Sequence, residues 1–151
     1  MAIRLAQFAA ILLAALALVP SGAHLLELPN KMALSREAYV IVQGIYRGWA
    51  LLGFVWIAAL VANAVLAYLT RAQPWPSRLA ALSAACFALM FAVFFTWTLP
   101  ANQATQNWTA VPEAWESLRL SWEYSHAANA AIVFAAACCS VLSALCWRPA
   151  P

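Results

Sequence analysis

The run Ala127–Trp147, AANAAIVFAAACCSVLSALCW, contains no Asp, Glu, Lys or Arg, and it indicates the fold class of the whole chain. Three further uncharged runs of closely similar length occupy Leu5–Leu26, Gly48–Thr70 and Leu79–Leu99. A helix of about 21 residues rises about 30 Å, which matches the hydrocarbon thickness of a bilayer. The sequence therefore predicts four transmembrane helices.

The overall composition agrees with this prediction. Hydrophobic residues make up 66% of the sequence, charged residues only 9%, and the mean hydropathy is +0.80. So little polar surface cannot cover a water-soluble domain of this size. We predict an all-α polytopic membrane protein in which residues 1–151 form a single four-helix bundle surrounded by the lipid bilayer. The predicted helices occupy about 5–28, 36–70, 79–99 and 112–147.

Two of these helices are predicted to be longer than the bilayer is thick. Ser35 suits the N-cap of the second helix, and Pro112 suits the first turn of the fourth. Both positions precede the uncharged runs, so the second and fourth helices should extend past the outer face. Pro29 is expected to end the first helix.

The charged residues predict the orientation in the membrane. Arg4, Arg71, Arg78 and Arg148 flank one set of helix ends, whereas all five glutamates belong to the other side. By the positive-inside rule, both termini are cytoplasmic and the chain is expected in the inner membrane of a bacterium. The basic residues form no cluster of the kind that binds nucleic acid, so no nucleic-acid partner is expected.

Two matching motifs are predicted to meet near the outer face. His24 and Glu27 are three residues apart in the first helix, and Glu123 and His126 are three apart in the fourth. Counted from Arg4 and Arg148, both histidines lie about 30 Å above the cytoplasmic side. Imidazole and carboxylate ligands suit iron, copper, manganese or zinc, and Glu-x-x-His pairs bind metals in helical bundles. We predict one transition-metal ion bound by these four side chains.

Other interpretations of the same residues remain open. Glu123 could instead join Arg36, Arg47, Glu116 and Arg119 in a purely structural ion-pair network without any cofactor, with His24 and His126 as hydrogen-bonded members. A haem bound by the two histidines is a further alternative.

Aromatic residues are concentrated on the predicted outer side, at Tyr39, Tyr46, Trp49, Trp97, Trp108, Trp115 and Trp122. The aromatic belt of membrane proteins accounts for most of them. They could also enclose a flat lipophilic molecule such as a quinone or a polycyclic phenol. Trp122, Tyr46 and Arg47 are the candidate binding residues.

The stretch Asn107-Trp108, Trp115-Glu116-x-Leu118-Arg119-x-x-Trp122-Glu123-x-x-His126 resembles the small four-helix membrane proteins grouped with the anthrone oxygenases. The resemblance implies an oxidoreductase that uses molecular oxygen on a lipophilic aromatic or quinone-like substrate. Of the family's site residues, His126, Trp122 and Arg119 are matched here, whereas Asn129 stands where the family carries a basic residue. In this hypothesis His126 acts as ligand or base, and Arg119 stabilises an enolate.

A competing hypothesis from another class makes the chain a non-catalytic membrane subunit, whose outer ion-pair network docks a partner protein or a second copy of the chain. The sequence does not decide between an enzyme and a subunit.

Overall fold

The computed structural model describes residues 1–149. In chain order it contains α1 (Ala2–Met32), α2 (Arg36–Gln43), the short 3-10 helices η1 (Gly44–Tyr46) and η2 (Trp49–Leu52), α3 (Gly53–Leu69), α4 (Pro74–Val93), the π-helical turn η3 (Phe94–Thr98), α5 (Leu99–Ala104) and α6 (Trp115–Cys146). Four helical segments are long and apolar enough to cross a membrane: Ala2–Met32, Trp49–Leu69, Pro74–Ala104 and Trp115–Cys146. The prediction of an all-helical membrane bundle with four spans is confirmed.

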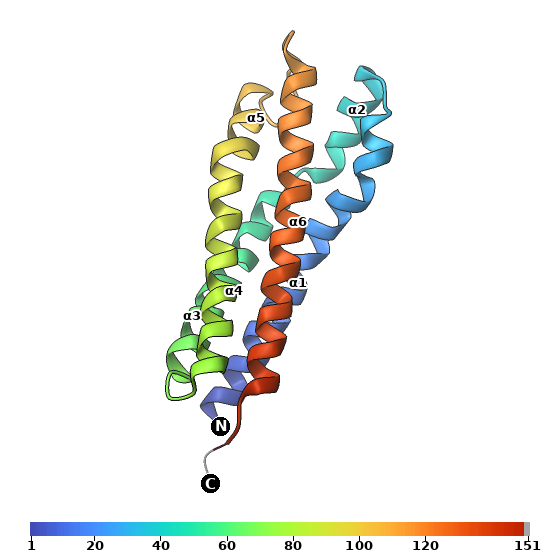
Figure 1. Cartoon of the computed structure of the whole chain (residues 1–151). Coiled ribbons are helices and arrows are strands. Elements are labelled where there is room, and N and C mark those ends of the chain that lie inside the picture. The colour runs from blue at the N-terminus through green and yellow to red at the C-terminus, as the bar shows by residue number, and fades with distance from the viewer. Residues whose placement is uncertain (150–151) are drawn as a thin grey trace.

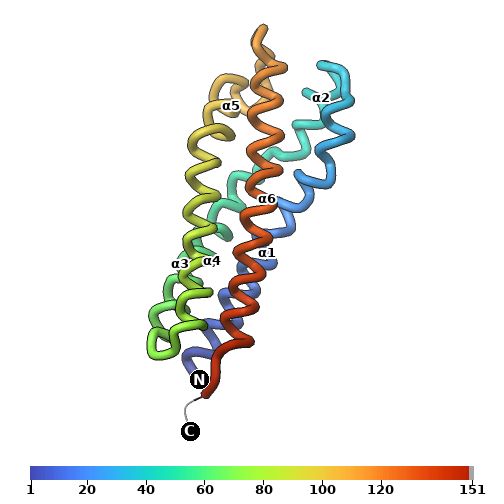
Figure 2. The backbone as a smooth tube through the Cα atoms, in the orientation of Figure 1, coloured from blue at the N-terminus to red at the C-terminus, as the bar shows by residue number. Residues whose placement is uncertain are grey.

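The spans run up and down around a ring. α6 packs against α1 and α4, and α3 packs against the same two helices from the other side. The start of α1 and the end of α6 lie at one end of the bundle, and α2 and α5 lie at the opposite end (Figure 1). Because this opposite end carries His24, Lys31 and Glu123, it is called the outer end below. Towards it α1 leans away from α4, so the bundle widens (Figure 2).

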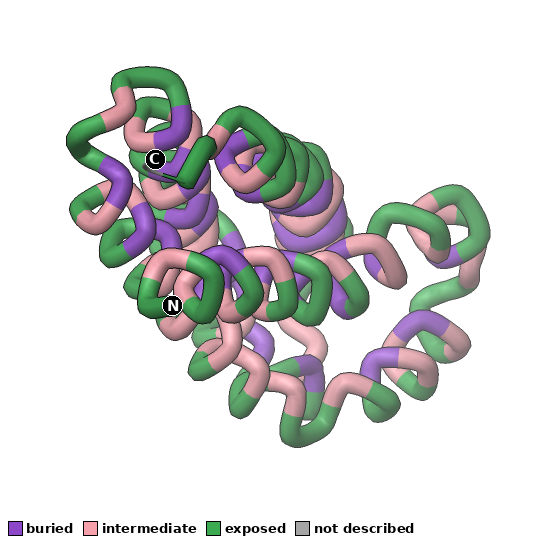
Figure 3. The backbone as a smooth tube through the Cα atoms, turned by 90° about the horizontal axis from the view of Figure 1, so that it is seen from below, coloured by how far each residue is buried: buried purple, intermediate pink, exposed green. Residues whose placement is uncertain are grey.

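The core consists mainly of small side chains. Ala14, Ala17, Ala59 and Ala136 are fully buried, together with Phe87 and Val133. Buried residues face inward and exposed residues outward along each helix (Figure 3). Large apolar side chains such as Phe8, Phe54 and Leu145 are exposed, as expected for surfaces in contact with lipid. Small residues let the helix backbones approach closely. Burying large apolar side chains between helices gains no hydrophobic free energy, because lipid tails are equally apolar.

A polar link crosses this core and joins three helices. Ser140 of α6 donates to Asn63 Oδ1 of α3 at 2.8 Å, and its hydroxyl lies 2.9 Å from that of Ser83 of α4. Unpaired polar groups are costly in hydrocarbon, so these bonds fix how the three helices are rotated against one another.

The first and third spans are longer than predicted. α1 continues through Pro20 and Pro29 to Met32 instead of ending near residue 28. A proline removes one backbone hydrogen bond, and contacts of residues beyond Pro29, described below, offset that loss. The third span starts at Pro74, in a first turn where N–H groups have no helical partner, and continues through the π-helical turn to Ala104.

The second span is not the continuous helix predicted over 36–70. Helical structure is interrupted after η1, because Arg47 has ψ 122° and Gly48 has φ +88°. A positive φ suits glycine, which has no Cβ to clash with the backbone. The membrane-spanning part therefore begins at Trp49, and Arg36–Gln43 forms the separate short helix α2, whose N-cap is Ser35, as predicted.

The fourth span starts three residues later than predicted. α6 begins at Trp115, while Pro112 lies in the preceding irregular segment. The segment between α5 and α6 contains three consecutive residues with positive φ, Gln106, Asn107 and Trp108.

Candidate functional site

The two histidines meet, as their matched depths predict. The rings of His24 on α1 and His126 on α6 are stacked, with centroids 4.0 Å apart and an interplanar angle of 27°. Trp122 contacts both rings edge-on, at centroid distances of 5.1 Å and 4.2 Å. Tyr46 lies against His24 at 4.6 Å. Direct packing of α1 on α6 brings the pair together at the outer end of the bundle.

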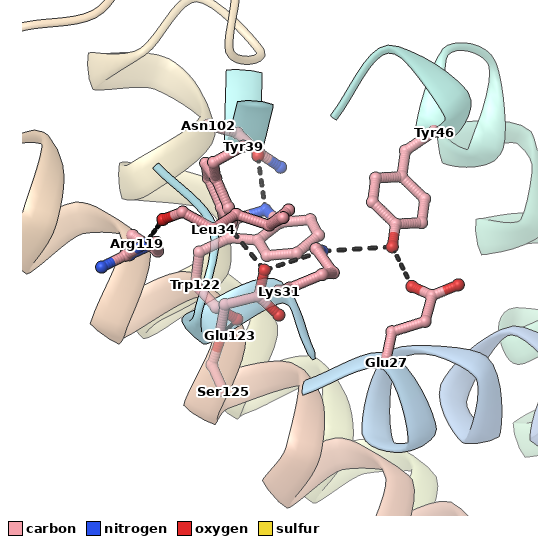
Figure 4. A network of polar contacts seen from close by, with 10 residues as sticks. All are labelled: Glu27, Lys31, Leu34, Tyr39, Tyr46, Asn102, Arg119, Trp122, Glu123 and Ser125. Carbon is pink, nitrogen blue, oxygen red and sulfur yellow. Dashed lines mark hydrogen bonds and ion pairs between the residues drawn. The ribbon is translucent and has the colours of Figure 1, made fainter. Parts of the chain in front are cut away.

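Lys31 forms a buried ion pair that the sequence analysis missed. Its Nζ lies 2.7 Å from Glu123 Oε1, and only 3% of Lys31 and 1% of Glu123 are exposed (Figure 4). The same nitrogen lies over the rings of Trp122 and Tyr46, at 4.4 Å and 4.5 Å from their centroids. Glu27 and Lys31 are four residues apart, so they share a face of α1. Pro29 predicts the end of this helix, so the sequence alone does not pair them.

Two tyrosines connect to this pair. Tyr39 donates to Glu123 Oε1 at 2.9 Å, Lys31 Nζ donates to the Tyr46 hydroxyl at 3.1 Å, and that hydroxyl donates to Glu27 (Figure 4). Burial raises the pKa of Tyr39 and of Tyr46, and the Glu123 and Glu27 carboxylates raise these pKa values further. Both tyrosines are therefore neutral hydrogen-bond donors that bind the two glutamates.

The four predicted metal ligands do not converge on one point. Glu123 is engaged by Lys31 and Tyr39, and Glu27 by Tyr46. Within residues 1–149, no group of three or more His, Cys, Asp or Glu side chains has the arrangement of a metal site. No three of the four predicted ligands are arranged around one point, so the observed donor set does not fit the predicted four-ligand ion. Metal binding stays a prediction, and no step of the chemistry below depends on it.

The histidine pair also leaves no room for a haem between the rings. An axial histidine points a ring nitrogen at the iron, along the plane of its own ring, from each side of the macrocycle. The observed rings are stacked face to face at 4.0 Å. Haem ligation by His24 and His126 would require the two rings to separate.

The remaining candidate residues divide into two groups. Arg119 donates to the Leu34 carbonyl at 3.2 Å and lies over Trp115, so it supports the chain near α2 instead of facing the histidines. Trp122, Tyr46 and Arg47 line a common cavity with the histidines. Trp122 is oriented by a 2.8 Å bond from its Nε1 to Asn102 Oδ1.

The predicted outer ion-pair network is not formed. Arg36, Arg47 and Glu116 are exposed, and Lys31–Glu123 is the one ion pair found within residues 1–149. That pair is buried inside the bundle. Docking of a partner protein stays a prediction.

The cavity has a volume of about 610 Å³ and lies at the outer end of the bundle. Every span contributes to it, and so do the two connections at the outer end, one between α1 and α3 and the other between α5 and α6. Its walls include His24 of α1, Trp56 of α3, Phe94 of η3, and Trp122 and His126 of α6. The segments Gly44–Ala50 and Gln106–Thr109 complete it, through Tyr46, Arg47, Gly48, Trp49 and Trp108 among others. Its lining combines several aromatic side chains with histidine, amide and other polar groups, and cavities of this size are typical of small-molecule sites.

Several polar atoms around the cavity are buried and have no hydrogen-bond partner in the protein. They are His24 Nδ1, both amide atoms of Gln43, and Trp108 Nε1. Gln43 was not among the predicted site residues, because a glutamine at the start of a predicted long helix carries no signal of burial. Unpartnered buried polar groups are rare in folded proteins, and at a cavity they indicate where a ligand forms hydrogen bonds.

Comparisons of the chain with protein-family models, with curated proteins and with solved structures found no match. The resemblance to the anthrone-oxygenase group therefore remains a hypothesis based on the motif around His126.

Proposed function

We propose that this chain binds a flat lipophilic aromatic or quinone-like molecule in the outer cavity and oxidises it. The observation that carries the proposal is the cavity of about 610 Å³, which combines aromatic walls with the stacked His24–His126 pair. Aromatic faces favour a planar ring system, while the imidazoles offer hydrogen-bonding and proton-accepting nitrogens. The motif around His126 supports the same substrate class.

The proposed chemistry starts with a proton transfer. His126 acts as the base that removes a proton from a phenol or from an activated CH₂ group between aromatic rings. The resulting anion passes electrons to molecular oxygen, which is the oxidant. A hydroquinone loses two electrons and two protons to become a quinone, and these convert one O₂ to hydrogen peroxide. When a CH₂ group becomes a carbonyl, the carbon loses two hydrogens and gains one oxygen atom, and the second oxygen atom leaves as water. Arg119 does not line the cavity, so we assign the enolate no arginine partner.

Membrane placement follows from the same proposal. The bundle would lie in the inner membrane of a bacterium with both termini in the cytoplasm and the cavity near the outer leaflet. Arg4, Arg71, Arg78 and Arg148 support this orientation, because they belong to the end that holds the termini. A lipophilic substrate could then enter from the bilayer.

Oxygen consumption by the purified protein tests the proposal. An anthrone and a naphthohydroquinone serve as substrates, and the quinone product is followed by its absorbance. We expect activity in the wild type, a loss of at least about 100-fold in His126→Gln, as typical for removal of a general base, and full activity in Leu120→Ala. Leu120 is exposed on the same helix, so it controls for handling of the membrane protein.

Wild-type protein that binds neither compound and consumes no oxygen would contradict the proposed function. Equal activity in His126→Gln and the wild type would instead remove His126 as the base. His24→Gln, measured alongside, shows whether the stacked partner contributes to the same step.

A further inference from the structure

Trp108 is held in a backbone conformation that bulky residues rarely adopt. Its φ is +64°, and it follows Gln106 at +50° and Asn107 at +55°. Three hydrogen bonds fix this segment: Asn107 N–H to the Asn102 carbonyl at 2.7 Å, Trp108 N–H to Thr105 Oγ1 at 3.1 Å, and Ala110 N–H to the Thr105 carbonyl at 3.0 Å. The local structure thus specifies where the Trp108 side chain lies.

The Trp108 side chain is buried at the wall of the outer cavity. Only 5% of it is exposed, and its ring meets Tyr39 and Trp122 edge-on at 5.0 Å and 6.2 Å. Its Nε1 is fully buried and has no acceptor in the protein. An indole N–H can only donate, so an acceptor atom is missing at this point of the cavity.

Gln43 and His24, on two other helices, also carry buried polar atoms without a hydrogen-bond partner. Gln43 on α2 is 5% exposed and neither its amide nitrogen nor its amide oxygen has a partner. His24 on α1 is 6% exposed, and its Nδ1 is likewise unpartnered. Three elements that are distant in sequence therefore each place an unsatisfied polar group at one cavity.

We propose that Trp108 determines ligand specificity by donating its indole N–H to an acceptor oxygen of the bound molecule, with Gln43 as its neighbouring polar partner. This inference rests on the proposed function, because it concerns the ligand of the same cavity. A ring system with a carbonyl oxygen satisfies Trp108 and the Gln43 amide nitrogen, and a hydroxyl group on that ring system satisfies the Gln43 oxygen. A hydrocarbon of the same shape satisfies none of them.

Binding of two shape-matched probes tests this assignment. Detergent-purified protein is titrated calorimetrically with 1,4-naphthoquinone and with 1,4-dimethylnaphthalene, and empty micelles give the blank. Trp108→Phe keeps an aromatic ring but removes the N–H group. We expect this variant to bind the quinone about 2- to 10-fold more weakly, the range for one hydrogen bond, and to bind the hydrocarbon as the wild type does.

Two further variants separate hydrogen bonding from packing. Trp97→Phe is the matched control, because Trp97 is 51% exposed and does not line the cavity, and it should leave both affinities unchanged. Gln43→Met retains the approximate side-chain shape and should also weaken the quinone selectively. Circular dichroism confirms that each variant is folded.

Each outcome has a defined meaning. Quinone binding that is unchanged in Trp108→Phe overturns this inference and leaves the proposed function standing. An equal loss for quinone and hydrocarbon also overturns it, because Trp108 would then act through packing alone. Wild-type protein that binds neither probe overturns the inference together with the proposed function.

Discussion

Replacing Lys31 by methionine should strongly destabilise the protein. The substitution removes the cation of an ion pair whose members are 3% and 1% exposed, and it leaves the Glu123 carboxylate without a counter-ion. Tyr39 would remain as a donor to Oε1, while Oε2 already has no partner. Removing one member of a buried pair typically costs about 3–5 kcal/mol, so we expect a loss in that range.

Equilibrium unfolding in mixed micelles measures this loss, with helical circular dichroism as the signal. Arg78→Met is the matched control, because Arg78 is an exposed cation at the opposite end of the bundle, and it should change the free energy of unfolding by less than about 0.5 kcal/mol. Glu123→Gln in the Lys31→Met background removes the uncompensated charge and should recover at least about 2 kcal/mol of the loss.

Two results would refute the reasoning. A loss below about 1 kcal/mol in Lys31→Met would mean that Glu123 reaches water or another cation, as surface pairs do. A double variant as unstable as the single one would show that the effect comes from lost packing of the lysine stem and not from the unpaired charge.

Two further predictions concern the outer end of the bundle. Gly48→Ala should destabilise the protein by about 1–2 kcal/mol in the same unfolding assay, because a residue with a Cβ is strained at the Gly48 φ of +88°. Crowding is not the cause, since no atom lies within 4 Å of where the alanine Cβ would be. Gly44→Ala is the control: its site is equally uncrowded and its φ is −60°, so it should be neutral. Because burial raises the pKa of Tyr39 and of Tyr46 in the folded protein, their stabilising contribution is complete below pH about 10 and is lost as the pH rises above it. For the fully buried Tyr39 the loss is up to about 1.4 kcal/mol per pH unit. Unfolding measured between about pH 9 and pH 11 should therefore show a shallower decline in Tyr39→Phe than in the wild type, and an unchanged decline in a variant of the 64% exposed Tyr68 would serve as the control.

The membrane spans and the histidine contact could be predicted from the sequence because both depend on distance along a helix. Uncharged runs of bilayer length define the spans, and counting from Arg4 and Arg148 places His24 and His126 at one level. The direct packing of α1 on α6 then brings the rings together. Depth is set by helix rise, which hardly varies with sequence.

The partners of the glutamates could not be predicted in the same way. Pro29 is a strong signal for the end of a helix, and it placed Lys31 in a loop. In the structure the helix continues by one turn, and Lys31 lies between Glu123 and Tyr46. A tertiary contact thus overrides a local preference, and it gives Glu123, one of the four predicted metal ligands, a buried cation as its partner.

The cavity was beyond sequence reasoning because it is formed where regular helix structure is interrupted. Residues 46–50 are consecutive, and all of them line it, as do residues 106–109. Consecutive residues of a helix point about 100° apart, so a helix face could supply only every third or fourth of them. The irregular residues 46–48 and 106–109 lie just outside the spans Trp49–Leu69 and Pro74–Ala104, where backbone polar groups that no helix pairs can reach water or a ligand. The break at Gly48 and the left-handed turn at Trp108 are therefore the features that form the cavity, and under the proposed function the bound molecule would contact both.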